Sequence, residues 1–263
     1  MKISIITIVY NRAYCIEDCI NSVLDQTYQN VEYIVIDGGS TDGTQKKIAP
    51  FKDKISYYIS EKDRGIFDAL NKGIKKATGD IIGILNSDDL FFDTKTLEQI
   101  VQAFSPKTDI VYAKGMFVDQ TNLSKVKRIY PSCPFKKKYL RFGWIPLHPT
   151  IYVRREIFLK YGYYNPGFTI ASDYEISLRW FQNDDIEKVF LDEWVVKMRL
   201  GGLSTSPRHQ LQKSKEDLRI IQHYKLNGWF TLAFKIGRKI PQYIIPRIKK
   251  IPSNTLSKSK NIA

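Results

Sequence analysis

The stretch ISIITIVYNR at residues 3–12 decides the fold. Its first part is almost entirely β-branched and apolar, which predicts a strand covered on both faces, as in a parallel sheet. The apolar run is too short for a signal peptide, and it ends in Asn11 and Arg12 without a small-residue cleavage site. We therefore predict a buried first strand rather than a leader.

Strand and helix patterns alternate outward from this stretch. We predict a helix with an apolar stripe from Ile16 to Leu24, and then strands at 31–36, 55–59, 81–85 and 110–113. Helices are predicted at 66–77 and 94–104. Strands separated by helices form right-handed βαβ units and an open, mostly parallel sheet. The predicted fold class is α/β and Rossmann-like.

The chain divides into three parts by composition. Residues 1–113 form the regular α/β half, and residues 114–206 form a less regular, aromatic-rich half of the same domain. Residues 207–263 form a basic C-terminal segment with 13 Lys and Arg residues against Glu216 and Asp217, within a chain of net charge +14. A nearly neutral body with a basic end calls for a separate explanation of that end.

The basic segment also carries aromatic and aliphatic residues from Gly228 onward. This amphipathic character predicts that it lies on an anionic membrane surface. The alternative is a terminal helix that packs on the core and exposes its lysines. No recognised nucleic-acid motif accompanies the charge, so we do not expect a nucleic-acid partner.

The cysteines indicate the compartment. Cys15, Cys19 and Cys133 are an odd, sparse set, which is typical of a reducing environment, and they have no metal-ligand spacing with the histidines. We expect core cysteines and a cytoplasmic protein, peripheral at the inner face of the cell membrane.

Polar residues follow the predicted strands where ligands bind in open α/β sheets, at the carboxyl ends. Asp37 and Ser40 follow the second strand, and Asp88 and Asp89 follow the fourth. Two adjacent carboxylates that leave a buried strand repel each other unless a cation relieves them, and Mg²⁺ or Mn²⁺ suits such oxygen ligands. Helix capping is the alternative for these positions, and it explains Asp93 better than Asp88.

Four motifs come in order along the chain: IITIVYNR (5–12), IDGGSTDGT (36–44), DRGIFDALNKG (63–73) and LNSDD (85–89). Together they resemble family 2 glycosyltransferases of the GT-A fold, the group that builds bacterial surface polysaccharides. The resemblance covers about residues 3–206. It implies that residues 1–113 bind a nucleotide-sugar donor, and that residues 114–206 bind the acceptor and supply the catalytic base.

The resemblance also implies roles for individual residues. The residues that match nucleotide-binding positions are Thr7, Tyr10, Asp37, Ser40, Arg64 and Asp88. Asp88 and Asp89 match the metal-binding acidic motif, in which Asn86 stands where many members have the first Asp. Gly38 replaces a second Asp common in the family. Either Asp88 or Asp89 could take the metal.

The second half supplies the remaining candidates. Asp173 matches the catalytic base at the start of a helix predicted near 173–182, for which Ser172 is a candidate N-cap. His148 and Arg199, together with Asn86 of the first half, are candidate donor or acceptor contacts. The stretch from Gly201 to Ser204, followed by Arg208, resembles a loop that closes over the diphosphate.

The expected function is therefore inverting, metal-dependent transfer of a sugar from a nucleoside-diphosphate donor to a lipid-linked or glycan acceptor, in polysaccharide assembly. Two alternatives remain: a sugar-nucleotide nucleotidyltransferase, and a non-catalytic nucleotide-sugar-binding membrane adaptor. A nucleotidyltransferase should carry a basic Gly-rich loop after the first strand, where this chain has Tyr10 and Asn11.

Overall fold

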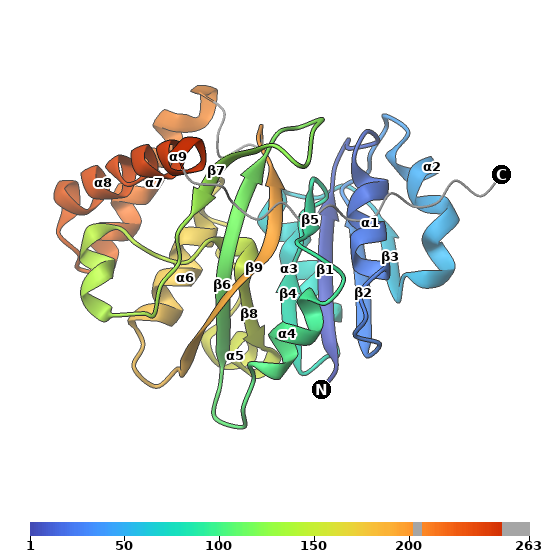
Figure 1. Ribbon diagram of the computed structural model, residues 1–263, viewed down its shortest axis with the longest axis horizontal. Helices are drawn as coiled ribbons and strands as arrows, with labels where there is room; N and C mark the ends of the chain where they lie inside the picture. Colours follow the sequence, from blue (N-terminus) through green and yellow to red (C-terminus); the bar gives the residue numbers. More distant parts are fainter. Residues whose placement is uncertain (202–206, 249–263) are drawn as a thin grey trace.

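The structure is a computed structural model, and it describes residues 1–201 and 207–248. One nine-stranded sheet runs through both halves of the chain, in the order β3-β2-β1-β4-β8-β6-β9-β5, with β7 added on β6 (Figure 1). The α/β, mostly parallel character predicted from the sequence is confirmed. The strands are β1 (Ile3–Val9), β2 (Val31–Asp37), β3 (Tyr57–Ser60), β4 (Ile81–Ile84), β5 (Asp89–Phe91), β6 (Ile110–Val118), β7 (Val126–Tyr130), β8 (Ile151–Arg154) and β9 (Lys188–Arg199).

The first four strands in sequence are parallel. β1 lies between β2 and β4, so that Val9 is level with Asp37, and Ile6 is level with Ile84. The carboxyl ends of these strands therefore meet at one edge of the sheet, as the sequence predicts. The third strand begins at Tyr57, two residues later than expected, because residues 49–54 form the 3-10 helix η1 (Ala49–Lys54).

Helices cover both faces of the sheet, and the strands alternate between two cores. Ile6 and Ile34 face the core beneath α3 (Ile66–Lys76), α5 (Arg155–Tyr161) and α6 (Ser172–Gln182). Ile5 and Val35 face the core beneath α1 (Ile16–Leu24) and α4 (Thr96–Gln102). Figure 1 shows α1 and α4 on the near face, while α3, α5 and α6 lie behind the sheet. Successive side chains of a strand point to opposite faces of the sheet, and both faces are buried at β1. The β1 sequence is therefore apolar at almost every position.

The second half contributes strands of both directions. β8 runs antiparallel to β4 and β6, whereas the long β9 runs parallel to β6 and antiparallel to β5. Two short 3-10 helices precede β8, namely η2 (Lys137–Phe142) and η3 (His148–Thr150). The first half also contains α2 (Thr44–Ile48), and these short elements have no clear periodicity in the sequence.

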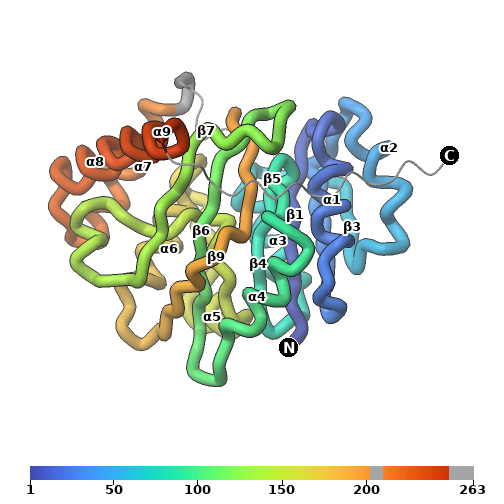
Figure 2. The backbone as a smooth tube through the Cα atoms, in the orientation of Figure 1, coloured from blue at the N-terminus to red at the C-terminus, as the bar shows by residue number. Residues whose placement is uncertain are grey.

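The C-terminal segment folds into α7 (Pro207–His223), α8 (Gly228–Gly237) and α9 (Lys239–Ile248). Figure 2 shows these helices at the end of the molecule opposite β3 and α2. Ile220 and Ile221 of α7 are fully buried in the main core, so the alternative that the segment packs on the core holds for α7. None of the helices in the described ranges has the length and apolar character needed to span a membrane.

Candidate functional site

The loops that follow β1 and β2 are joined by hydrogen bonds. The backbone amide of Asn11 donates to the Ser40 hydroxyl at 2.8 Å, and the Thr41 amide donates to the Asn11 side-chain oxygen at 2.9 Å. Asn11 has a φ of 51°, a left-handed conformation that Asn tolerates better than most residues. The sequence change from an apolar strand to Asn11 thus marks a specific turn.

Asp37 holds the second loop from inside. Its side chain is fully buried and accepts hydrogen bonds from the hydroxyl and amide of Ser40 and from the hydroxyl of Ser60. Such bonds compensate a buried carboxylate for the loss of water. Asp37 and Ser40 therefore shape the edge of the sheet as a unit.

An open surface lies beside these loops. Tyr10 is 60% exposed although it directly follows a buried strand, and it lies against Gly38. A Cβ at position 38 would come within 3.0 Å of a carboxylate oxygen of Asp63 and 3.4 Å of the Tyr10 ring. Asp63 thus places a carboxylate beside the position where the family commonly has a second Asp. We did not single out Asp63 from the sequence, although it begins the third motif.

Basic residues flank this surface. Lys72 of α3 pairs with Asp63 at 2.5 Å and with Glu61 at 2.7 Å. Its hydrogen bonds with these two carboxylates outweigh desolvation and raise the pKa of Lys72. The Arg64 side chain is 88% exposed, and its contact with Asp68 at 3.2 Å is a weak surface pair. The Arg64 guanidinium is therefore accessible to a ligand.

The two carboxylates that follow β4 differ in environment. Asp89 is almost fully buried, and it accepts a hydrogen bond from the Asn86 side-chain amide at 2.9 Å. Burial, and then the charge of Asp88, raises the pKa of Asp89 well above its usual range. Asp88 is only half-buried. Of the pair, Asp88 is the carboxylate that a ligand can reach.

Arg199 at the end of β9 holds the Asp88 loop. Its guanidinium donates to the Asp88 carbonyl oxygen at 3.2 Å, to the Gln120 carbonyl oxygen and to the Asp18 carboxylate. The Arg199 residue is only 6% exposed, whereas its partner Asp18 has a side chain that is 52% exposed. Arg199, predicted as a donor or acceptor contact, lies beside the site as a support of its backbone.

Cys15 and Cys19 pack beneath the same loop, close to the carbonyl oxygens of Ser87 and Asn86. Both are buried, as expected for core cysteines, and burial raises the pKa of the Cys15 thiol to about 11. The Thr7 side chain is fully buried and receives a hydrogen bond from the Tyr33 hydroxyl at 3.1 Å. A contact between Thr7 and a nucleotide stays a prediction.

Asp173 lies in the first turn of α6 and is half-buried. Burial lowers the pKa of His148, and the negative charge of Asp173 opposes this lowering. Burial, and then the charge of Asp173, raises the pKa of Tyr164 well above its usual range. His148 and Tyr164 are themselves joined by a hydrogen bond of 2.6 Å between Nε2 and the hydroxyl. A carboxylate, an imidazole and a phenol thus share one neighbourhood.

The start of α6 corrects one expectation. Ser172 is the first residue of the helix and not its cap, and its buried hydroxyl has no hydrogen-bond partner. The N-cap residue is Ala171, which has no side chain able to cap.

Two elements connect the Asp173 neighbourhood to the first half of the sheet. Phe67 of α3 stacks on Tyr164 with ring centroids 5.7 Å apart, and Asn71 of α3 makes two hydrogen bonds with the Tyr164 backbone. The helix η3, which begins at His148, contacts both β4 and α6. The structure therefore places the second group of candidates against the elements that carry the first.

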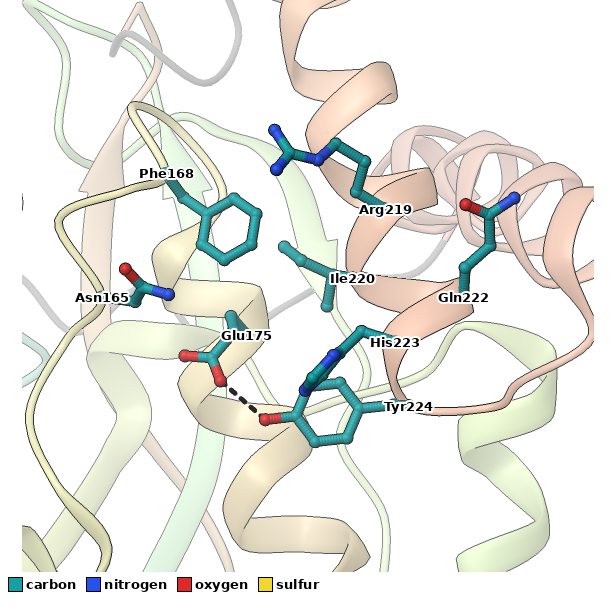
Figure 3. A pocket seen from close by; sticks show the side chains of 8 residues that line it. All are labelled: Asn165, Phe168, Glu175, Arg219, Ile220, Gln222, His223 and Tyr224. Carbon is teal, nitrogen blue, oxygen red and sulfur yellow. Dashed lines mark hydrogen bonds between the residues drawn. The ribbon is translucent and has the colours of Figure 1, made fainter.

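A separate pocket lies between α6 and α7 (Figure 3). It is lined by Asn165, Phe168, Glu175, Arg219, Ile220, Gln222, His223 and Tyr224. Glu175 accepts a hydrogen bond from the Tyr224 hydroxyl at 2.6 Å and pairs with Arg179. None of the residues predicted from the sequence lines this pocket.

Part of the predicted diphosphate loop lies outside the described residues. This holds for Gly202 to Ser204 and for the side chain of Arg208, whereas Gly201 is described and has a φ of 114°.

Solved structures share this architecture. The Staphylococcus aureus protein TarS, crystallised with UDP-GlcNAc, matches with a TM-score of 0.68 at 20% identity over 89% of this chain and 69% of that one. The mannosyltransferase PcManGT of Pyrobaculum calidifontis, solved with GDP-Man and Mn²⁺, matches with a TM-score of 0.61 at 17% identity over 96% of this chain and 77% of that one. The curled, mostly parallel sheet with its loops at the carboxyl edge is thus a GT-A fold.

The sequence defines the family. The model of glycosyl transferase family 2 matches residues 4–170, and the chain belongs to this family. An uncharacterised glycosyltransferase of Rickettsia typhi is 32% identical over 78% of this chain, which spans 65% of that relative's length. A PGL/p-HBAD biosynthesis glycosyltransferase of Mycobacterium tuberculosis is 27% identical over 77% of this chain and 79% of its own length.

Proposed function

We propose that this protein transfers a sugar from a nucleoside-diphosphate donor to an acceptor hydroxyl, with inversion at the anomeric carbon. The observation that carries the proposal is the accessible Asp88 carboxylate, which lies at the same sheet edge as the open surface of Tyr10 and Gly38. Arg199 holds the Asp88 loop there through the backbone carbonyl oxygen of Asp88. Family membership favours sugar transfer over a nucleotidyltransferase.

The nucleotide of the donor fits the surface beside β1 and β2. The exposed ring of Tyr10 offers a face on which a base can stack, and Gly38 leaves the adjacent space free of a side chain. Asp63 can accept hydrogen bonds from base or ribose, and Arg64 supplies an accessible positive charge. The nucleotide sugars bound by TarS and PcManGT support this class of donor.

The residues present also fit a divalent cation, Mn²⁺ or Mg²⁺. In the described ranges no three His, Cys, Asp or Glu side chains cluster to hold a cation by themselves. Mg²⁺ commonly takes one or two carboxylates and completes its shell with phosphate and water oxygens, which Asp88 allows. Asp89 is assigned to the support of the loop, because it is buried and bonded to Asn86. When bound, the cation neutralises charge on the diphosphate.

Asp173 is the proposed base. The acceptor hydroxyl gives its proton to the Asp173 carboxylate while its oxygen forms a bond to the anomeric carbon. The bond from that carbon to the diphosphate oxygen breaks, and its electron pair leaves with the nucleoside diphosphate. Attack from the face opposite the diphosphate inverts the configuration. His148 and Tyr164 line this neighbourhood and can orient the acceptor.

Assay of transfer and donor hydrolysis tests the proposal. Purified protein is incubated with UDP-, GDP- and TDP-sugars, Mn²⁺ and lipid-linked or glycan acceptors, and the anomeric configuration of the product is read by NMR. We expect one nucleotide class to be turned over, with inversion. Turnover of none of them, or a product of retained configuration, would contradict the proposal.

An exposed apolar surface supports a membrane partner at the inner face of the cell membrane. It consists of the exposed residues Trp229, Phe230, Phe234, Ile236, Ile240, Tyr243, Ile244 and Ile248 of α8 and α9. Arg247 is exposed on the same helices, where it can meet anionic headgroups. A lipid-linked acceptor would then lie near the same surface.

Vesicle flotation tests this partner. We expect the full chain to float with phosphatidylglycerol vesicles, and the triple variant Trp229→Ser, Ile240→Ser, Ile248→Ser to remain behind. Leu159→Ser is the matched control, because Leu159 is 60% exposed on α5. Equal flotation of the triple variant and the wild type would exclude this surface as the membrane contact. Truncation at residue 206 is unsuitable, since it removes the buried Ile220 and Ile221.

A further inference from the structure

The loop that leads into α6 is held by a side chain from elsewhere in the chain. Amides at the start of a helix have no partner within it and usually bond to an N-cap side chain. Ala171 occupies the N-cap position and cannot do this, and the Ser172 hydroxyl forms no hydrogen bond. The amides of residues 169–171, in the loop that leads into the helix, bond instead to an acceptor from outside this segment.

Glu216 of α7 is that acceptor. One of its carboxylate oxygens receives the amide of Thr169 at 3.1 Å, and the other receives the amides of Ile170 and Ala171, both at 2.9 Å. Glu216 is only 7% exposed, so the three bonds are shielded from water. A carboxylate at a helix N-terminus also interacts favourably with the helix dipole.

The position of Glu216 is fixed by the packing of α7. Ile220 and Ile221, one turn further along α7, are fully buried in the main core. Figure 3 shows side chains of α7 facing the loop at Asn165 and Phe168 and the Glu175 side chain of α6. Gln212, one turn earlier on α7, donates to Glu216 at 3.2 Å. A side chain held in this way can define where α6 begins.

We propose that Glu216 is a positioning residue for Asp173, so that one side chain of α7 helps to place the proposed base. This role rests on the proposed function, in which Asp173 is the base. Asp173 comes two residues after Ala171, so a change in the 169–171 backbone moves the base directly. Glu216 and α7 lie beyond residues 4–170, which the family model matches. Glu216 and its neighbour Asp217 are the two acidic residues of the basic C-terminal segment, and both are buried.

Hydrogen–deuterium exchange tests the structural half of the proposal without any substrate. We expect Glu216→Ala to accelerate exchange of a peptide that spans 169–171, because three amides lose their acceptor. Glu216→Gln keeps one carbonyl oxygen and should give intermediate exchange. It also serves where the Ala variant does not fold. Ile221→Val is the matched control, since it loosens the packing of α7 but leaves the carboxylate in place. Unchanged exchange in both Glu216 variants would overturn the proposal.

Steady-state kinetics tests the other half. A small misplacement of a catalytic group can cost about 10²-fold in rate. We therefore expect Glu216→Ala to lower kcat by about 10- to 100-fold, with a smaller loss in Glu216→Gln and a nearly unchanged KM for the donor. Ile221→Val should keep the wild-type kcat. Faster exchange at 169–171 with wild-type kcat would overturn the positioning role. Wild-type kcat in Asp173→Asn would instead refute the base, and with it the proposed mechanism.

Discussion

Arg199 donates a hydrogen bond to the backbone carbonyl oxygen of Asp88 over 3.2 Å, although 111 residues separate the two in the chain. The bond ties the last residue of β9 to the loop that follows β4. It links the end of the second half of the sheet to the carboxylate that we assign to the cation. The loop therefore depends on β9 as well as on its own strand.

Arg199→Ala should weaken nucleotide binding as well as folding. The change removes a buried guanidinium donor from the partly buried carbonyl oxygens of Asp88 and Gln120, which costs about 1–3 kcal/mol in the free energy of unfolding. We expect weaker binding of the Mn²⁺–nucleoside diphosphate complex by calorimetry. Arg128→Ala is the matched control, because Arg128 is similarly buried and bonds to Gln242 on α9 at 2.7 Å. If both variants lose stability but keep the same nucleotide affinity, Arg199 does not support the site.

Asp173→Asn should keep donor binding and lose turnover. An amide of the same shape cannot take the acceptor proton, and loss of a positioned base usually costs about 10²–10⁴ in rate. Initial rates of transfer and donor affinity measure the two effects separately. Asp185 is an exposed residue that follows α6, so Asp185→Asn should leave both the transfer rate and the donor affinity unchanged. Near-wild-type transfer by Asp173→Asn would remove Asp173 from the mechanism.

Gly38→Asp, which restores the residue common in the family, should impair this protein. The new side chain would begin 3.0 Å from a carboxylate oxygen of Asp63 and bring two like charges together. We expect weaker nucleotide binding and a loss of about 1 kcal/mol in stability. The double variant Gly38→Asp, Asp63→Gly should recover both quantities. No recovery in the double variant would mean that Asp63 does not occupy the place of the missing Asp.

Glu32 makes the stability of the sheet pH-dependent. It bonds to Lys2, Ser4 and Thr78, and these bonds outweigh desolvation and lower its pKa to about 2. Because the folded-state pKa lies below the unfolded one, the stabilisation is present at neutral pH. It is lost as the pH falls from about 5 towards 2.

Urea unfolding between pH 3 and pH 8 measures this contribution. We expect Glu32→Gln to lower the free energy of unfolding by about 2–3 kcal/mol at pH 7, and by progressively less at lower pH. Glu193→Gln, an exposed change, should follow the wild type. A difference between Glu32→Gln and the wild type that stays constant with pH would contradict this assignment.

Strong local patterns predicted the first half of the fold. The β-branched run of β1 and the apolar stripes of α1 and α3 were enough, because these elements bury whole faces against their neighbours. The apolar end of β4 and the acidic residues behind it likewise predicted where Asp88 lies. Each of these patterns is contained in a short stretch of neighbouring residues.

Contacts between distant residues were not predictable. Ser172 is of a residue type that often caps helices, yet it is the first residue of α6, and the loop before it is held by Glu216 from 45 residues away. Thr7 matches a nucleotide-binding motif, but the pleat of β1 turns its side chain toward Tyr33. Asp63 lies beside position 38, a contact between two separate motifs that neither motif predicts by itself. In each case the decisive partner lies on another element.

Calorimetric titration of a nucleoside diphosphate, with and without Mn²⁺, tests the central claim most directly. The wild type should bind UDP, GDP or TDP, with clearly higher affinity when Mn²⁺ is present. Asp88→Asn should abolish the increase caused by Mn²⁺, whereas Asp80→Asn, on the opposite edge of the sheet, should retain it. Binding of no nucleoside diphosphate by the wild type, or an undiminished Mn²⁺ effect in Asp88→Asn, would contradict the assignment of the donor site to this edge of the sheet.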